Sequence, residues 1–283
     1  MSPNRSPRAD YVPVASPVSP RAVVEHCFGP DGRADLATVH DVAGVLGLDD
    51  QPVRLAVRRL VAAGVVEQTG RGRGGTLRLA TAARLRSALD LAYWDFAVQQ
   101  DDGVSTWDGL WRLVAFSVPE SRRAERDALR SALAHLGAAP LAPGLVVSPH
   151  DLVPALRAEL GGLDVRDVLT TATTAAVVHA GHDLTEQVPQ LWELDTVRAG
   201  YDRLDDEIEA WRSRLGERDG GAEPLVLAAR IALHVALDRA VVPDPLLPPE
   251  LLPAGWPGQQ VRGAFRRLWA TIDGGSPLSV VVR

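Results

Sequence analysis

Lysine is absent from the chain, because all 30 basic residues are arginine. A Walker-type phosphate loop and a pyridoxal Schiff base both require lysine, so these two classes of site are excluded. Cys27 is the only cysteine, which rules out an intrachain disulfide and a thiolate-rich zinc site. No apolar run approaches the roughly 20 residues that cross a bilayer. We therefore expect a cytoplasmic protein with no membrane partner, no cofactor and no bound metal.

Acidic residues are scarce in one part of the chain, although the net charge of the whole chain is −6. Residues 51–86 contain eight arginines and a single acid, Glu67. Residues 91–283, in contrast, contain 18 arginines and 27 acidic residues. A short basic block on an acidic chain is typical of a DNA-reading module attached to a larger body.

A length of 283 residues is too great for one ordinary domain and suits two or three. The first twenty residues include five prolines and no apolar signal-peptide core, which predicts a disordered tail. The predicted parts are a tail at 1–20, a winged helix DNA-binding domain at 21–90, a ferredoxin-like dimerisation domain at 91–185 and a helical C-terminal domain at 186–283.

The pattern of residues 21–79 is that of a winged helix-turn-helix. Helices are predicted at 21–28, 38–46 and 51–63, with short strands at 65–68 and 76–79. Gly47 supplies a left-handed stop before the turn, and Pro52 sits in the first turn of the next helix, where its missing N–H costs nothing. Helix, helix, tight turn, helix and two-stranded ribbon is the winged helix order, so we predict this fold.

The remainder predicts an α+β domain followed by helices. A helix from Thr81 to Phe96 is followed by a polar boundary at 99–105. Alternation and turn residues then predict strands at 111–118, 144–147, 165–169 and 174–179, with helices at 119–137 and 152–160. This order suggests a small ferredoxin-like domain. Further helices are predicted at 190–215, 223–241 and 257–272.

The third helix has two distinct faces. Its apolar stripe is formed by Val53, Ala56, Val57 and Leu60. Its opposite face carries Gln51, Leu55 and Arg58, flanked by Arg54 and Arg59. Arginine can donate two hydrogen bonds to guanine, glutamine can read adenine, and leucine can contact a thymine methyl, so this face suits a major groove. The alternative is a solvated helix whose arginines only keep the protein soluble.

A Gly/Arg stretch at 70–75 lies between the two predicted strands and matches the spelling G-x-G-x-x-G. A dinucleotide site needs those glycines between a strand and a helix, whereas TLRL follows here, so we reject that reading. Arg71 and Arg73 at the tip, with Arg78 in the next strand, suit a wing that contacts phosphate or enters a minor groove. An ordinary glycine-rich hairpin is the alternative.

The chain resembles the PaaX family of repressors of phenylacetate-degradation operons. The motifs that carry the resemblance are AVRRLV at 56–61, WDGLWRLV at 107–114, FSVPE at 116–120, PGL at 143–145, VSPH at 147–150, DPLLP at 244–248 and WPG at 256–258. The resemblance implies a winged helix, a central domain similar to the Cas2 fold and a helical C-terminal domain. It also implies a homodimeric repressor bound to operator DNA and released by an acyl-CoA effector such as phenylacetyl-CoA.

Candidate effector-binding residues lie in those motifs, and they are Trp107, Trp111, Arg112, His150 and Trp256. The alternative is that the tryptophans form core packing and that Arg112 forms a structural ion pair. His179 and His182 have a metal-like spacing but no other ligands nearby. Ser148, His150 and Asp151 are too close in sequence to converge as a triad. We therefore expect no catalytic or metal site.

Three other functions stay open at this point. Cas2-like domains can carry a metal-binding aspartate at the end of the first strand, but Ser117 stands there in this chain, which argues against a nuclease. The protein could instead be a DNA-binding regulator that responds to no effector, or an activator that recruits polymerase through its acidic helical domain. The preferred interpretation is a repressor of a catabolic operon that is released by a small molecule.

Overall fold

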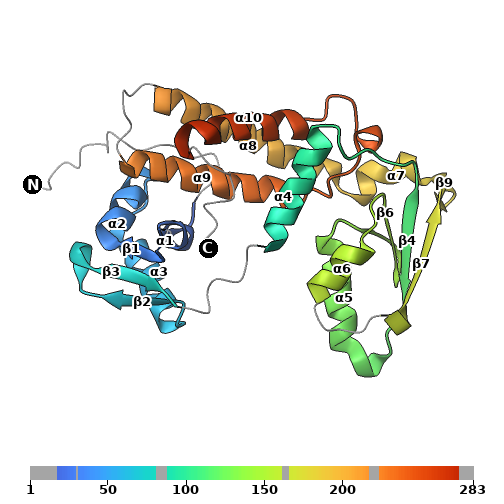
Figure 1. Ribbon diagram of the computed structural model, residues 1–283, viewed down its shortest axis with the longest axis horizontal. Coiled ribbons are helices and arrows are strands. Elements are labelled where there is room, and N and C mark those ends of the chain that lie inside the picture. The colour runs from blue at the N-terminus through green and yellow to red at the C-terminus, as the bar shows by residue number, and fades with distance from the viewer. Residues whose placement is uncertain (1–17, 30, 81–87, 161–165, 217–222, 274–283) are drawn as a thin grey trace, which may run out of the picture. The chain divides into compact units, whose positions relative to one another are not determined.

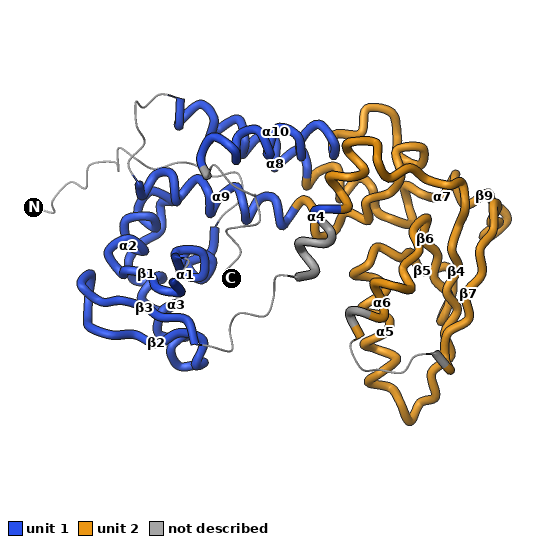
Figure 2. The backbone as a smooth tube through the Cα atoms, in the orientation of Figure 1, with its two compact units in different colours: residues 1–95, 201–239, 258–283 blue, residues 96–200, 240–257 orange. Residues whose placement is uncertain are grey.

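The computed structural model describes residues 18–29, 31–80, 88–160, 166–216 and 223–273. The chain divides into two compact units (Figure 2). Unit 1 contains residues 1–95, 201–239 and 258–283, and unit 2 contains residues 96–200 and 240–257. Most of the predicted tail at 1–20 and the start of the helix predicted from Thr81 lie outside the described residues. No described helix has both the length and the apolar character that a bilayer crossing requires.

The first part of unit 1, residues 18–80, is called the N-terminal head below (Figure 1). Its elements are α1 (Pro20–His26), β1 (Arg33–Asp35), α2 (Leu36–Val45), α3 (Asp50–Ala62), β2 (Val66–Thr69) and β3 (Thr76–Leu79). The three strands form an antiparallel sheet in the order β1-β3-β2. The predicted helices and ribbon therefore form, within one or two residues. Strand β1 was not predicted, because three residues are too few to show an alternating pattern.

Local sequence explains where the helices of the head begin and end. The Ser19 hydroxyl accepts a hydrogen bond from the Ala22 amide at 3.1 Å, and Pro20 occupies the first turn of α1. Gly47 has a φ of +75° and follows α2, as the sequence predicted for a left-handed stop. The apolar stripe of α3 is buried, and α1 and α2 pack against this helix. Cys27, directly after α1, is also buried.

The rest of unit 1 is helical. It contains most of α8 (Leu194–Gly216) and α9 (Glu223–Val241), together with α10 (Gly258–Asp273). The predicted bounds of α9 agree with the structure. Phe265 and Trp269 stack with ring centroids 5.3 Å apart, and the Arg262 guanidinium donates to the Tyr201 hydroxyl at 2.6 Å. His26 of α1 lies 4.9 Å from His234 of α9 between ring centroids, so the head contacts these helices.

Unit 2 is built on a four-stranded antiparallel sheet in the order β5-β6-β4-β7, called the central sheet below. Its strands are β4 (Trp111–Phe116), β5 (Ala139–Ala142), β6 (Leu145–Ser148) and β7 (Leu169–Thr174). Helix α5 (Arg123–His135) connects β4 to β5, and α6 (Val153–Leu160) lies between β6 and β7. This β-α-β-β-α-β order with its strand arrangement is the ferredoxin-like topology. A small ribbon, β8 (Val178–His179) with β9 (His182–Asp183), follows.

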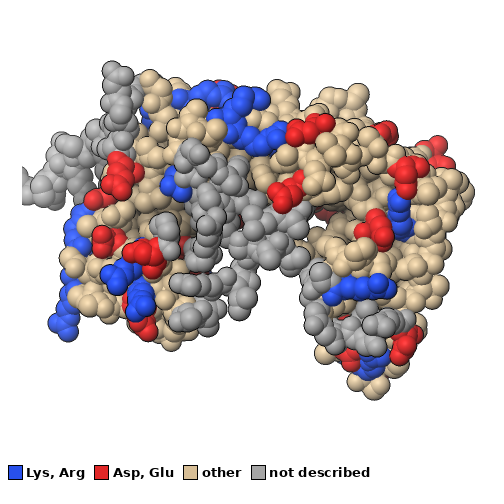
Figure 3. Space-filling view, viewed as in Figure 1, with Lys and Arg blue, Asp and Glu red and all other residues tan. Residues whose placement is uncertain are grey.

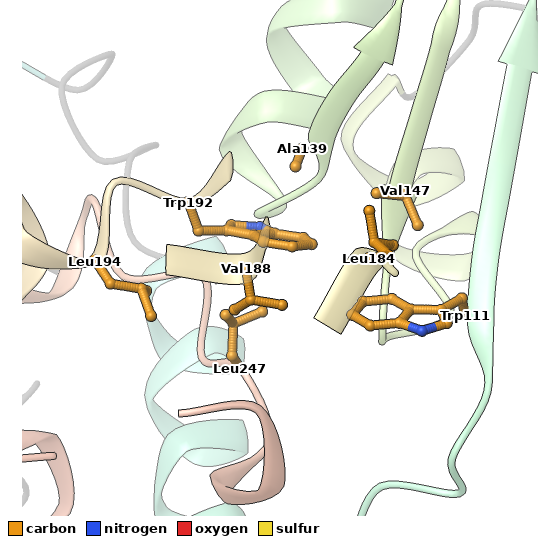
Figure 4. Close-up of a cluster of buried hydrophobic side chains, with 8 residues drawn as sticks. All are labelled: Trp111, Ala139, Val147, Leu184, Val188, Trp192, Leu194 and Leu247. Carbon is orange, nitrogen blue, oxygen red and sulfur yellow. The ribbon is translucent and has the colours of Figure 1, made fainter. Parts of the chain in front are cut away.

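Two cores lie on the two faces of the central sheet. On one face, Val114 and Val146 pack with Leu129 and Leu133 of α5 and Leu156 of α6. On the other face, a cluster gathers Trp111, Ala139, Val147, Leu184, Val188, Trp192, Leu194 and Leu247 (Figure 4). At Gly144, between β5 and β6, φ is +77° and a Cβ would lie 2.6 Å from the Phe116 carbonyl oxygen, so only glycine fits.

Several predicted elements of unit 2 were wrong. The first part of the polar boundary predicted at 99–105 is helical, because α4 (Ala88–Asp101) ends only at Asp101. Gln100 is buried there, and its side-chain amide donates to the carbonyls of Leu246 and Leu247 at 2.9 and 3.2 Å. A buried polar residue that hydrogen-bonds to distant carbonyls cannot be distinguished from a loop residue by sequence alone. The strand predicted at 165–169 is a 3-10 turn over Arg166–Val168, and β7 begins only at Leu169.

The helix predicted at 190–215 forms as α8, which begins four residues later, and the preceding helix α7 (Leu184–Leu191) was not predicted. The break between α7 and α8 falls at Glu193, whose φ is +46°. Pro189, expected to precede the helix, lies inside α7. The side chain of Asp183 accepts from the Thr185 amide at 2.8 Å and starts this helix earlier than the proline suggested.

Candidate nucleic-acid interface

The face of α3 opposite its buried stripe is open to solvent. Gln51, Arg54, Arg58 and Arg59 are exposed, and 43% of Leu55 is accessible, which is high for leucine. The helix therefore presents the residues that the sequence predicted for base contacts on its outer side. Packing against α1 and α2 holds the helix from behind, so the exposed side chains extend from a rigid element.

A groove of about 640 Å³ lies beside α3 and is called the α3 groove below. It is bordered by α2, by α3 and by the loop between β2 and β3. Its lining residues are Leu36, His40, Asp50, Arg54, Val57, Arg58, Gln68, Arg71, Gly72 and Arg73. Four predicted DNA-contacting arginines, two from the helix and two from the loop, thus share one concave surface. Such a surface can hold a phosphate backbone.

Four of the predicted DNA-contacting residues do not line this groove. Gln51, Leu55 and Arg59 lie on other parts of the exposed face of α3. Arg78 is exposed on β3, in register with Arg33 of β1 and Glu67 of β2. The structure leaves all four accessible to a ligand.

The loop between β2 and β3 is fastened to α2. The Leu36 amide donates to the Gly75 carbonyl at 2.9 Å, and Gly75 is buried. A Cβ on Gly75 would lie 2.9 Å from Leu36 Cδ1 and 3.2 Å from the Thr69 carbonyl, so glycine permits this close approach. Arg73 also forms an ion pair with Asp41 of α2. The loop tip is therefore held against the head rather than projecting freely.

Two carboxylates at this surface were missed by the sequence analysis. Asp50 accepts from His40 Nδ1 at 3.0 Å and from the Arg54 guanidinium at 3.3 Å. Desolvation is the largest single effect on Asp50 and raises its pKa, but His40 and Arg54 together outweigh it and lower the pKa. The i, i+4 spacing of Asp50 and Arg54 could have revealed this pair. Asp41 and Arg73 are 32 residues apart, so no local sequence pattern predicts their ion pair. Arginines and carboxylates are accordingly mixed on the face of the N-terminal head that Figure 3 shows.

Replacing Asp41 by asparagine is expected to raise the affinity for any duplex. The substitution removes a negative charge and releases Arg73, and an exposed ion pair contributes up to about 1 kcal/mol, which corresponds to about fivefold in affinity. Fluorescence anisotropy with an unrelated duplex at fixed ionic strength measures the change. Asp95→Asn, which removes the same charge from an exposed position of α4, is the control. Equal effects of the two variants would contradict a specific role of Asp41.

The predicted effector residues fall into two groups. Trp111 is 1% exposed and lies in the core between Trp107 and Trp192, with ring centroids 5.4 and 6.1 Å away. The Arg198 guanidinium lies 5.1 Å from the ring centre of Trp256. Neither Trp111 nor Trp256 lines the pocket that the other three share.

Trp107, Arg112 and His150 do come together, in a pocket of about 270 Å³ that also contains Phe96 and Gln100. Arg112 is paired with Asp108 and donates to the carbonyls of Leu110 and Pro149 at 2.7 and 2.6 Å. This volume lies just below the range of about 300–1,000 Å³ of typical small-molecule sites. The pocket can therefore enclose a small group and not a whole coenzyme A thioester.

Two buried histidines make the stability of the fold depend on pH. Burial lowers the pKa of His26, and nearby His234 adds to the effect. Burial also lowers the pKa of His150, whose Nε2 donates to the Leu246 carbonyl at 2.8 Å. The unfolded chain, with histidine pKa values near 6.5, binds more protons than the folded chain just below that pH.

The melting temperature is therefore expected to fall as pH decreases from 7.5 through about 6.5 towards the folded-state pKa values of these histidines. Carboxyl groups with lowered pKa values change their protonation only near and below about pH 4, so they do not change the melting temperature between pH 7.5 and 6.5. Differential scanning calorimetry at several pH values measures the effect. His150→Gln, which retains an N–H donor, should reduce the slope. A melting temperature that is constant or rises towards pH 5.5 would contradict the prediction.

Among the residues that the structure describes, no group of three potential metal ligands is found. His179 and His182 face each other in the register of β8 and β9, and His182 is exposed. The two histidines are therefore explained by a small ribbon.

Comparison with known proteins identifies the chain. The model of the PaaX protein central Cas2-like domain matches residues 104–188, and that of the PaaX-like protein C-terminal domain matches residues 192–277. The fold is thus that of a mixed α+β protein with a Cas2-like central domain and a helical C-terminal domain. The two matches cover more than half of the sequence, and the chain belongs to the PaaX family.

One curated protein is similar in sequence, and one solved structure is similar in fold. The chain is 26% identical over 261 residues to the transcriptional repressor PaaX of Escherichia coli (strain K12), covering 88% of this chain and 78% of the relative. An uncharacterized protein of Mycobacterium tuberculosis, Rv0674, has a similar structure with a TM-score of 0.52 and 22% identity, covering 93% of this chain and 98% of the other. The curated relative is a transcriptional repressor, which agrees with the expectation of a regulator rather than an enzyme.

Proposed function

We propose that this chain is a DNA-binding transcriptional repressor that acts in the cytoplasm. The N-terminal head is a winged helix-turn-helix, α3 is its recognition helix, and the loop between β2 and β3 is its wing. The observation that carries the proposal is the α3 groove, where Arg54 and Arg58 of the helix face Arg71 and Arg73 of the wing. The similarity to the E. coli repressor supports the same function.

In this proposal, α3 enters the major groove and the wing contacts the adjacent backbone. Arg58, with Gln51 and Leu55 beside it, reads base edges, while the wing arginines neutralise phosphates. The protein acts as a homodimer, because two linked heads on a palindrome gain specificity and effective concentration over one head.

The gene target of the proposed repressor is a catabolic operon, and an acyl-CoA such as phenylacetyl-CoA releases the protein from DNA. The pocket at Trp107, Arg112 and His150 would hold the acyl group, with the rest of the coenzyme outside it. Release requires that the effector bind the DNA-incompetent state more tightly than the DNA-bound state. An effector-independent regulator is the second candidate, and the small volume of this pocket favours it.

A binding titration tests both candidates. Fluorescently labelled duplex from the DNA upstream of the protein's own gene should bind more tightly than a shuffled duplex of the same composition. Phenylacetyl-CoA should release the specific complex, and free coenzyme A, which has the same charge-bearing part, should not. Specific binding that no thioester reverses would leave the second candidate. Equal binding of both duplexes would contradict sequence-specific repression.

The wing is tested by Arg73→Ala. Because this residue is assigned to a phosphate, its loss should weaken binding to specific and shuffled duplexes by similar factors. The slope of log K against log salt concentration should fall in magnitude by about 0.9, the value for one phosphate contact in duplex DNA. Titrations at four or more salt concentrations give this slope. An unchanged slope would show that Arg73 stays with Asp41 in the complex.

A further inference from the structure

The two edges of the central sheet differ in how well they are protected. At one edge, β5 has only four residues, contains Pro140, and shows a register shift between Pro140 and Ala142. Short length, proline and a bulge are the devices by which proteins block further strand pairing. The other edge is β7, which is six residues long and pairs with β4 over its whole length.

Strand β7 has none of these devices. Residues 168–178 contain no charged residue, no proline and no glycine, and Thr170, Thr171, Ala172 and Thr173 are all exposed. Among the described residues, no strand pairs with the outer side of β7, which forms the margin of the sheet (Figure 1). An uncharged edge rich in β-branched residues is a template for pairing with another strand, and native proteins rarely leave one uncovered.

The hydrogen-bond register shows which backbone groups of β7 are available. The Ser117 amide donates to the Val168 carbonyl at 3.1 Å, while the Phe116 amide donates to Gly144 on the opposite side. Bonding residues alternate along an antiparallel pair. Residues 170, 172 and 174 therefore bond to β4, and the N–H and C=O groups of Leu169, Thr171 and Thr173 point outward.

We propose that β7 is the dimer interface and pairs antiparallel with β7 of a second copy of this chain across a twofold axis. This inference rests on the homodimer in the proposed function and gives that dimer its contact. An isologous pair places each strand opposite itself, and a strand without charge can do so without repulsion. Threonines opposite threonines also form favourable cross-strand pairs.

Neighbouring surface extends this contact beyond one strand. A depression of about 370 Å³ lies beside β7, and both apolar and charged residues line it. Its lining residues are Arg112, Leu113, Val114, Asp151, Leu152, Val153, Thr171, Ala172 and Thr173. Val178, four residues after β7, is 73% exposed, which is high for valine. A stable dimer buries more than strand pairing alone provides, and the partly exposed Val153 and the exposed Val178 supply additional apolar area.

The oligomeric state of the full-length chain tests the proposal. Light scattering after size exclusion should give the wild type twice the mass of one 30.3 kDa chain. The double variant Thr171→Lys/Thr173→Lys, which adds four like charges to the interface of a dimer, should give the single-chain mass. The control is Ser131→Lys/Ala134→Lys, which adds two lysines at exposed positions of α5 and should stay dimeric.

Single cysteines give a second test that does not depend on the lysine variants folding. Burial raises the pKa of Cys27 to about 12, so this thiol does not compete at neutral pH. Cysteines placed one at a time at positions 170 to 173 should include one that forms a covalent dimer on mild oxidation, since a disulfide needs Cα atoms within about 7 Å. Ser131→Cys should not crosslink.

The outcomes separate this inference from the proposed function. A dimeric wild type whose lysine variant is also dimeric, with no crosslinking position in β7, would overturn the β7 interface and leave the dimeric repressor intact. A monomeric wild type at about 100 µM would overturn both the interface and the proposed homodimer. The base contacts assigned to α3 are tested separately with the Arg58 variants, and neither result overturns them.

Discussion

Arg58→Ala is expected to weaken binding to the specific operator by about 1–3 kcal/mol, or roughly 5- to 150-fold, with little effect on shuffled DNA. Arg58 is exposed on α3 and lines the groove that the helix forms with the wing. A bidentate contact between guanidinium and guanine depends on the base, so its loss reduces discrimination more than general affinity. Competition between operator and shuffled duplexes at fixed salt concentration measures the ratio of the two affinities.

Two companion variants make this result specific. Arg58→Lys retains the positive charge but loses the planar fork, so it should behave like the alanine variant if the residue reads a base. Arg123→Ala removes an arginine whose side chain is 71% exposed on α5 of the central domain, and operator binding should be unchanged. An Arg58→Ala protein with the wild-type affinity ratio would show that another face of the head meets DNA.

Trp211→Ala is expected to lower the free energy of unfolding by about 3–5 kcal/mol, the largest change we predict. The indole of Trp211 is fully buried in α8, so its removal leaves a large cavity. The indole N–H also donates to the carboxylate of Glu207, itself fully buried, at 2.9 Å. Truncation therefore removes both packing and a partner of a buried carboxylate.

Urea unfolding followed by circular dichroism measures this loss, because the midpoint falls with stability. Trp211→Phe retains an aromatic ring and removes the N–H donor, so it should cost about 1–3 kcal/mol, less than alanine. Comparing the two variants separates the stability lost through the cavity from the stability lost with the hydrogen bond. Equal stabilities of the alanine variant and the wild type would contradict the packing of α8 described above.

The sequence predicted the N-terminal head closely because its signals are local. The period of α3, the stop at Gly47 and the glycines of the wing each act within a few residues. The same holds for α9, whose apolar run is long. The failures involve partners distant in sequence: Gln100 resembles a loop residue until the carbonyls of Leu246 and Leu247 are beside it.

The candidate site divides in the same way. Clustered arginines in the sequence predicted the surface that the structure presents, and four of them line one groove. The carboxylate of Asp41 could not be predicted, because its partner Arg73 reaches it only through the fold. The sequence motifs identified tryptophans as effector candidates but could not tell a core tryptophan from one that lines a pocket. In the structure, Trp111 is a core residue and Trp107 lines a pocket.

The attachment of the β2–β3 loop to α2 has a consequence for the kinetics of the proposed DNA recognition. A loop that must order itself on DNA reduces affinity by its lost conformational entropy, and often slows association. Here the Leu36–Gly75 hydrogen bond fixes the base of the loop beforehand. With the loop ordered in advance, no loop rearrangement has to precede binding, so electrostatic steering governs the association rate constant. This rate constant should therefore decrease as salt is added.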